Sequence, residues 1–301
     1  MSRALAFAVA AICVTSMDVV AQDFSVYTQV YDLDAKAANQ PAGPIARSRT
    51  LFHVGKVYDV IPETAEVTII EPAHRRITIL NSDRNVVSVV DFDELKHLLK
   101  EAEERLAQRV LELEKKPDAS RQKIETLRFQ LRPFFESEFD PAKHRLRLLS
   151  KSVTYEVDGK VSDHAEAVDK YLNYADWVCR LNYVLHPQPL FPSVRLELND
   201  HLRRHRMLPT RVALRTNLDR PLNLKADHSV AWALDTLDRR ASTNGSRCCA
   251  IPLCRRSRCL NISGSRLARR RRRRSRGKAD GRKQSQLGRC LLHSALRAIA
   301  N

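Results

Sequence analysis

Cysteine is nearly absent from the body of this 301-residue chain. Between residues 22 and 240 only Cys179 is present, so no disulfide can form within that region. The other six cysteines are Cys13 and five that follow residue 240. The fold must therefore be held by an apolar core. Cys179 lies on the apolar face of an expected helix, which predicts a buried thiol rather than a reactive one.

Long apolar runs and local catalytic motifs are also missing. No run reaches the ~18–20 apolar residues that a transmembrane helix needs, so we expect no permanent membrane anchor. The chain has no GxSxG, P-loop, GxGxxG or Cys–His signature, which leaves the common hydrolase and nucleotide-binding classes without support. An enzyme that lacks a local sequence signature remains an alternative interpretation. We expect no cofactor and no metal.

The first 240 residues lack an excess of charge of either sign. The chain has 52 Lys+Arg and 35 Asp+Glu, but residues 241–301 contain 17 of those bases and one of those acids. The body is thus close to neutral, which argues against a general nucleic-acid binder. With 43% apolar residues, the body has the length and composition for a globular domain.

The segment 241–301 differs in kind from the rest. It has no Phe, Tyr, Trp, Val or Glu, and it contains six consecutive arginines at 269–274. A basic arm that binds nucleic acid or an acidic partner is one interpretation. A zinc site is weakly indicated, because Cys249, Cys254 and Cys259 lack the short CxxC spacing. The composition favours a third interpretation, a disordered tail produced by a frameshift in a GC-rich gene.

The N-terminus has the layout of a secretory signal. Arg3 precedes the apolar stretch 4–14, and Ala21 closes a small-residue cleavage site before Gln22. An ordinary buried helix is the alternative interpretation. The pattern predicts a signal peptide at 1–21 and a mature protein in the periplasm or outside the cell.

Alternating apolar residues and turn residues predict a β-rich first half. The expected strands cover residues 24–33, 50–61, 66–71, 75–80 and 85–90. Because their connections are short, neighbours should be antiparallel and form a meander with one apolar face.

A helical hairpin follows at 91–135. Asp91 and Glu94 have the spacing of a capping box, and apolar residues recur every three or four positions to Lys116. A second helix is expected at about 120–135. Its stripe and that of the first helix should cover an apolar surface, with the preceding sheet as the nearest candidate.

The second half repeats this mixture. Strands are expected at 145–149 and 152–157 with a hairpin turn at Asp158-Gly159, then helices at about 163–185 and 193–206, and strands at 210–216 and 228–235. Clustered strands separated by helical blocks are typical of an α+β fold. We predict one α+β domain at 22–240, with a curved antiparallel sheet covered by amphipathic helices.

Three segments carry a family resemblance: Thr50–Ile61, Glu66–Pro72 and Val90–Leu95. Together they resemble an uncharacterised family of secreted bacterial proteins, over roughly residues 24–235. More distantly, successive hairpins with a helical cover are similar to the periplasmic lipoprotein-carrier half-barrel. That likeness implies an apolar cavity between sheet and helices. Neither resemblance places a functional residue on this chain.

Two polar groups on the expected helices contain residue types that bind metals or act in catalysis. His201 and His205 lie one helical turn apart, as in HExxH zinc sites, but Leu202 replaces the base and arginines surround them. A solvated basic face is the favoured interpretation. Four polar residues stand around the start of the long helix: Asp163, His164, Glu166 and Asp169. Acids there complement the helix dipole, and catalytic or metal-binding carboxylates are the alternative interpretation.

Two further groups lie on or beside the first strands. His53, Tyr58 and Asp59 alternate with apolar positions, so that two of them are expected to face one groove. Glu71 and His74 flank a turn beside Arg75 and form a candidate acid–base pair. A polar, exposed turn is the simpler interpretation.

The sequence favours an exported, non-catalytic protein that binds an apolar ligand, an envelope component or a protein partner. It identifies no catalytic, metal-binding or ligand-binding residue. An extracytoplasmic hydrolase is the main alternative, and it predicts Asp, Glu and His residues that converge in a cleft with shifted pKa values. A nucleic-acid or acidic partner for the tail is a second alternative.

Overall fold

The fold is described from a computed structural model, which covers residues 23–35, 43–162, 164–185, 190–219, 221–240, 242–243 and 255–256. The predicted signal peptide at 1–21 lies outside these residues. So does the predicted tail, apart from residues 242–243 and the pair 255–256. The expectations of export, disorder and frameshift therefore stay predictions.

The first half of the sheet is a meander of six consecutive antiparallel strands. They are β1 (Phe24–Asp32), β2 (Ala46–His53), β3 (Lys56–Ile61), β4 (Glu66–Glu71), β5 (Arg76–Asn81) and β6 (Val86–Asp91). The short 3-10 turns η1 (Pro62–Thr64) and η2 (Pro72–His74) join β3 to β4 and β4 to β5. Each begins with proline and ends at a left-handed residue, Ala65 or Arg75, so the predicted breaks are confirmed.

The second half is another meander, and it meets the first in the middle of the sheet. Its strands are β7 (Glu136–Asp140), β8 (Arg145–Leu149), β9 (Val153–Val161), β10 (Met207–Thr216) and β11 (Asn223–Ala231). The first strand pairs with the last of these, β1 with β11, in antiparallel register. Within the tail, β12 (Arg255–Arg256) pairs in parallel with the edge strand β6.

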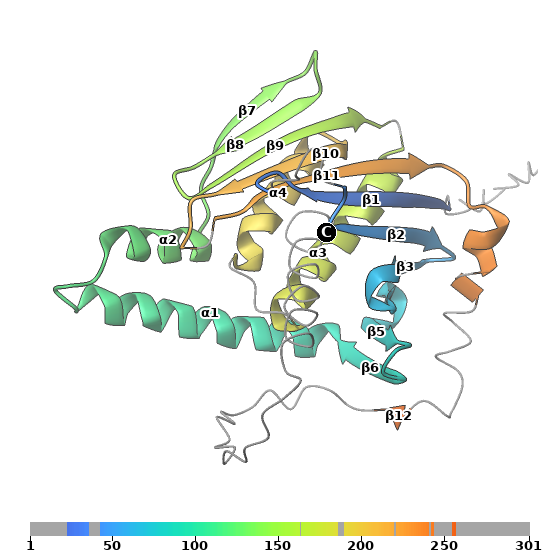
Figure 1. Cartoon of the computed structure of the whole chain (residues 1–301), viewed down its shortest axis with the longest axis horizontal. Coiled ribbons are helices and arrows are strands. Elements are labelled where there is room, and N and C mark those ends of the chain that lie inside the picture. The colour runs from blue at the N-terminus through green and yellow to red at the C-terminus, as the bar shows by residue number, and fades with distance from the viewer. Residues whose placement is uncertain are drawn as a thin grey trace, which may run out of the picture.

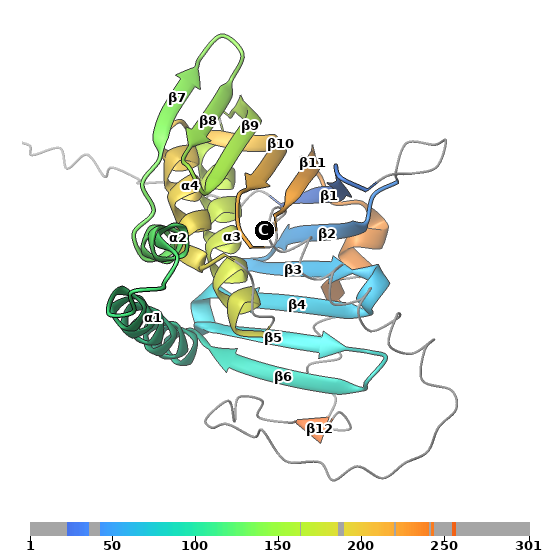
Figure 2. The ribbon, with the colours of Figure 1, turned by 60° about the vertical axis from the view of Figure 1, so that its left-hand side comes forward.

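Two of the helices lie on one face of this sheet (Figures 1 and 2). They are α3 (Ala165–Leu185) and α4 (Pro192–Arg204), whereas α1 (Phe92–Glu114) and α2 (Arg121–Leu131) form a hairpin at the side. Figure 2 shows the strands changing direction from β6 to β7 around α3. The α+β class and the antiparallel sheet are confirmed. Within the described ranges, no helix combines the length and apolar character of a membrane span.

The main core lies between the sheet and α3. Ten side chains of α3 are buried, and they meet inward residues of both meanders, such as Phe52 from β2 and Val157 from β9. A smaller cluster on the opposite face joins Leu51, Tyr58 and Ile69 to Leu234. The sheet therefore has apolar side chains on both faces of its first half, rather than on one as the meander argument predicted.

The hairpin does not cover the sheet as expected. The buried side chains of α1 are Phe92, Leu95, Val110 and Leu113, which lie near its two ends. α1 packs against α2 and α3, and it reaches the sheet at β6, directly before its first residue. Its N-cap is Asp91 as predicted, but the Asp91 side chain makes no capping hydrogen bond.

Several strand boundaries differ from the predictions. Strands β2, β10 and β11 begin three to five residues earlier than expected, and three further differences follow. The segment 50–61 is not one strand, because Val54 and Gly55 form a turn between β2 and β3. Gly159 lies inside β9 rather than in a hairpin turn: a Cβ there would stand 2.9 Å from the Leu208 backbone oxygen of β10. Close backbone approach explains that glycine. Strand β11 ends at Ala231, so the predicted strand end at residue 235 is wrong, although apolar residues alternate as far as Leu234. Strand β7 was not predicted.

Candidate functional site

A pocket of about 350 Å³ opens between α3 and the ends of β2, β3 and β4. We call it the mouth pocket. It is lined by Asp23, Phe52, His53, Val54, Gly55, Lys56, Val57, Ile70, Pro72, Lys170, Asn173, Tyr174 and Trp177. The volume lies within the range of small-ligand sites in proteins.

The floor of the mouth pocket is apolar because of strand register. Phe52, Val57 and Ile70 are direct neighbours across β2, β3 and β4, so all three point to the same face. From α3, Tyr174 meets Phe52 edge-on, with ring centroids 5.7 Å apart, and Trp177 stacks on Phe92 of α1 at 3.6 Å. Three strands and two helices thus hold the floor.

A buried polar network fixes Tyr174 from behind. The Thr50 hydroxyl donates to the Asp59 carboxylate at 3.0 Å and lies 3.3 Å from the Tyr174 hydroxyl. Burial, followed by the nearby Asp59 charge, raises the pKa of Tyr174 well above its usual value. The phenol is therefore protonated at neutral pH, and its ring presents an apolar face to the pocket.

One side of the rim is a strained turn held by Asp23. The Asp23 carboxylate lies 2.8 Å from His53 Nδ1 and accepts a hydrogen bond from the Val54 backbone N–H at 3.4 Å. Val54 has a φ of 49°, in the left-handed region that a β-branched residue rarely adopts. Its side chain is 73% exposed at the mouth. Such strain is typical of functional positions and costs about 1–3 kcal/mol.

The second side of the rim is a cluster of charges around Glu71. Its carboxylate, 6% exposed, binds Lys56 Nζ at 2.8 Å and Arg76 Nε at 2.6 Å, with His74 Nδ1 at 3.5 Å. Burial pushes the pKa of Glu71 upward, but the hydrogen bonds from Arg76 and Lys56 outweigh it and hold the pKa at about 2. Glu71 is therefore a permanent anion beside the pocket, shared by two cations.

The third side comes from the first turns of α3. Lys170 pairs with Glu166 one turn earlier, at 2.8 Å. Asn173 follows, and its Oδ1 accepts a hydrogen bond from Arg203 of α4 at 3.4 Å. These residues place an ammonium and a side-chain amide above the apolar floor.

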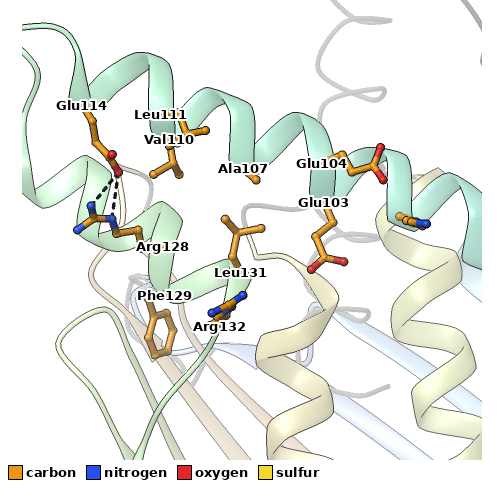
Figure 3. Close-up of a pocket in the computed structure, with 11 residues that line it drawn as sticks. Glu103, Glu104, Ala107, Val110, Leu111, Glu114, Arg128, Phe129, Leu131 and Arg132 are labelled. Atoms are coloured by element: carbon orange, nitrogen blue, oxygen red, sulfur yellow. Dashed lines mark hydrogen bonds and ion pairs between the residues drawn. The ribbon is translucent and has the colours of Figure 1, made fainter.

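A larger groove of about 910 Å³ lies between α1 and α2 (Figure 3). Apolar side chains, including Val110 and Leu131, face the space between the helices, and an ion pair from Arg128 to Glu114 stands at one end. Much of its lining is exposed, with Leu111 at 57%. It is an open surface groove in which Val110 is the one buried lining residue, so we place the candidate site in the mouth pocket.

The structure places the two histidines of α4 apart from the mouth pocket. His201 is buried and lies 3.5 Å from Glu197 on its own helix, while the His205 ring stacks on Phe139 at 3.9 Å. Burial, then the Arg204 charge, lowers the pKa of both. The described residues contain no group of three metal-ligating side chains. The prediction of a solvated basic face is therefore wrong for His201, which is buried, although Arg204 is exposed.

The acids at the start of α3 are exposed, as their role at a helix N-terminus requires. Glu166 and Asp169 lie on the surface, and the His164 ring lies 4.6 Å from that of Trp232. Asp163 lies outside the described residues. These side chains do not converge on a cleft.

The polar residues predicted near the first strands do not all lie on the same face of the sheet. His53 reaches the rim and Asp59 the buried network behind Tyr174, whereas Tyr58 points to the opposite face. The prediction of an exposed turn is wrong for Glu71, because this residue is only 5% exposed. Arg75 pairs instead with Asp93, the second residue of α1, at 2.7 Å.

Cys179 is buried as predicted, and burial raises the pKa of its thiol to about 12. A further buried group that sequence reasoning missed is His228, whose Nδ1 lies 3.0 Å from the Thr28 hydroxyl. Burial, then the Arg195 charge, lowers the pKa of His228 to about 3. Both side chains are neutral near pH 7 and belong to the core.

Several rim and floor residues were not predicted. Asp23, Lys56 and the three α3 residues Lys170, Asn173 and Trp177 carried no signal of their own in the sequence. Only a prediction that α3 packs beside the β2–β3 turn would have joined them to His53.

No protein-family model and no curated protein matches this chain. The resemblances to a secreted bacterial family and to the lipoprotein-carrier half-barrel therefore stay predictions.

Proposed function

We propose that the protein is an exported, non-catalytic binding protein that takes a small apolar ligand into the mouth pocket. The observation that carries the proposal is the pairing of an apolar, aromatic floor with an open polar rim. Floors of this kind supply affinity through burial of apolar area, and polar rims orient the ligand.

The strain at Val54 supports this assignment. A left-handed β-branched residue persists only where its surroundings impose it, and here Asp23 holds the turn from the side. The turn presents an exposed apolar side chain at the entrance of the pocket. A structural hairpin alone favours Asn or Gly at such a position.

Export forms part of the proposal. Cleavage after Ala21 makes Asp23 the second residue of the mature chain, and Asp23 belongs to the rim. The second residue of the mature chain then lies at the mouth. Mass spectrometry of the protein recovered from its host tests both the start at Gln22 and the presence of residues 241–301.

The binding proposal is tested by blocking the mouth without disturbing the core. Asn173 is exposed on α3 and lines the pocket, whereas Asp169, one turn earlier, is exposed and lies outside the lining. We expect Asn173→Phe to weaken binding of 1-decanol at least about tenfold, while Asp169→Phe leaves it unchanged. Isothermal titration measures both. Equal decanol affinity in the two variants, or none in the parent protein, would contradict the proposal.

A hydrolase is the second candidate, and the Asp23–His53 pair at the rim favours it. An imidazole oriented by a carboxylate is a recurrent general base. At this position it would act on a water molecule, because the lining contains no serine or cysteine. Turnover of short-chain esters that disappears in His53→Gln, with decanol binding retained, would establish this function.

A further inference from the structure

We infer that the ligand of the mouth pocket is a single-chain amphiphile with one anionic head group. This inference rests on the proposed function and adds the chemical class of the ligand. It is carried by the distribution of charge around the rim and by the volume of the pocket.

The rim and its ion-pair partners have more cations than carboxylates. The cations are Lys56, Arg76, Lys170 and Arg239, and the carboxylates are Asp23, Glu71 and Glu166. The pocket lining itself contains two lysines and one carboxylate. The potential at the mouth therefore favours an anion over a cation.

The two lysines can turn to a ligand at little cost. Lys170 shares a one-turn helix pair with Glu166, whose side chain is 54% exposed, and such surface pairs contribute little to stability. Lys56 shares Glu71 with Arg76, whose Nε lies 2.6 Å from the other carboxylate oxygen, so Glu71 keeps a cationic partner if Lys56 turns away. Neither movement strands a buried charge.

Asp23 does not cancel this attraction. Its two carboxylate oxygens are engaged with His53 Nδ1 and the Val54 N–H, and the Arg239 guanidinium, 4.0 Å away, offsets its charge. Asn173 adds a donor, because the hydrogen bond from Arg203 to its Oδ1 leaves its Nδ2 amide hydrogens for a head group. A carboxylate at the mouth thus meets two ammonium groups and an amide.

The volume limits the apolar part of the ligand. At roughly 30 Å³ for each group of heavy-atom size, about 350 Å³ accommodates about twelve such groups, the number of heavy atoms in decanoate. Two long acyl chains exceed it. Decanoate therefore matches both the floor and the rim.

The experiment compares three probes with the same ten-carbon tail and different heads: decanoate, 1-decanol and decyltrimethylammonium. The chain has two tryptophans, Trp177 in the pocket and Trp232 outside the lining, so a Trp232→Phe background makes Trp177 the reporter. We expect fluorescence titrations at pH 7.5 to give decanoate about tenfold tighter binding than decanol, and the ammonium the weakest.

Charge variants assign the preference to the rim. Lys170→Met should remove about five- to tenfold of the decanoate affinity and leave decanol unchanged, while Lys170→Arg restores decanoate binding. Lys160→Met, which removes an exposed lysine outside the lining, is the matched control for net charge. An unchanged melting temperature shows that each variant is folded.

The outcomes separate the two levels of the argument. Equal affinity for decanoate and decanol, or tightest binding of the ammonium, overturns the anionic head group and leaves the pocket standing as an apolar site. If Lys160→Met weakens decanoate as much as Lys170→Met, the preference comes from net charge, and the inference is wrong. If no probe binds, the proposed function itself falls.

Discussion

Helices α3 and α1 have nearly the same length, 21 and 23 residues, and both carry apolar stripes. Yet α3 buries ten side chains against the sheet, and α1 buries four near its ends. Both stripes contain alanine, Ala175 in α3 and Ala102 in α1, but α1 has eleven charged residues and α3 has five. A helix with fewer charged residues can bury a wider face, so the width of the apolar face, and not its period, marks the covering helix.

Removal of one leucine from each helix tests this contrast most strongly. Leu172 of α3 is 0% exposed and Leu111 of α1 is 57% exposed. We expect Leu172→Ala to lower the free energy of unfolding by about 3 kcal/mol, because a cavity is left in the core. Leu111→Ala should cost less than about 0.5 kcal/mol. Urea denaturation of the two matched variants measures the difference, and similar losses would show that α1 is as integral as α3.

Much of the sheet could be predicted from the sequence because its signals are local. Strands β4, β5 and β6 were placed within a residue by period-two alternation and by prolines and asparagines in their turns. The Val54-Gly55 turn was missed, because valine gives no sign of a left-handed backbone. Gly159 misled for the opposite reason, since its signal was a turn and its cause was close approach to β10.

The candidate site was far less predictable, because its parts are distant in sequence. His53 attracted attention as a polar residue in a strand, but Lys170 and Trp177 stand more than 100 positions away on an ordinary helical face. These residues come together because α3, rather than the 91–135 hairpin, covers the face of the sheet. The error in assigning the covering helix and the failure to find the pocket therefore have one cause.

Stability at low pH tests the contact between the sheet and the start of α1. Arg75, in the turn after Glu71, accepts the Phe92 N–H at its backbone oxygen and pairs with Asp93, so the Glu71 cluster borders the start of α1. The pKa of Glu71 falls from 4.5 to about 2 on folding. Its contribution is thus nearly complete above pH 4.5 and lost as the pH falls toward 2, and amounts to at most about 3 kcal/mol.

Glu71→Gln isolates that contribution from other carboxylates. We expect the variant to be about 2 kcal/mol less stable than the parent at pH 7 and nearly equal to it at pH 2. Denaturation at a series of pH values gives both curves. Parallel curves at all pH values would show that Glu71 is not held ionised by Lys56 and Arg76. Faster amide exchange at the start of α1, with α3 unchanged, would place the loss at this contact between the sheet and α1.

The smallest effect distinguishes the two helices of the hairpin. The Ser120 side chain accepts a hydrogen bond from the Lys123 N–H at 3.4 Å and caps α2, whereas Asp91 occupies the same position before α1 without such a bond. Ser120→Ala should therefore cost about 0.5–1 kcal/mol, and Asp91→Ala only a few tenths. Because the hairpin lies beside the sheet, the loss in Ser120→Ala should appear as faster hydrogen exchange in α2 alone. If exchange in α3 accelerates as well, the hairpin and the core unfold as one unit, and the division between a covering helix and a lateral hairpin is wrong.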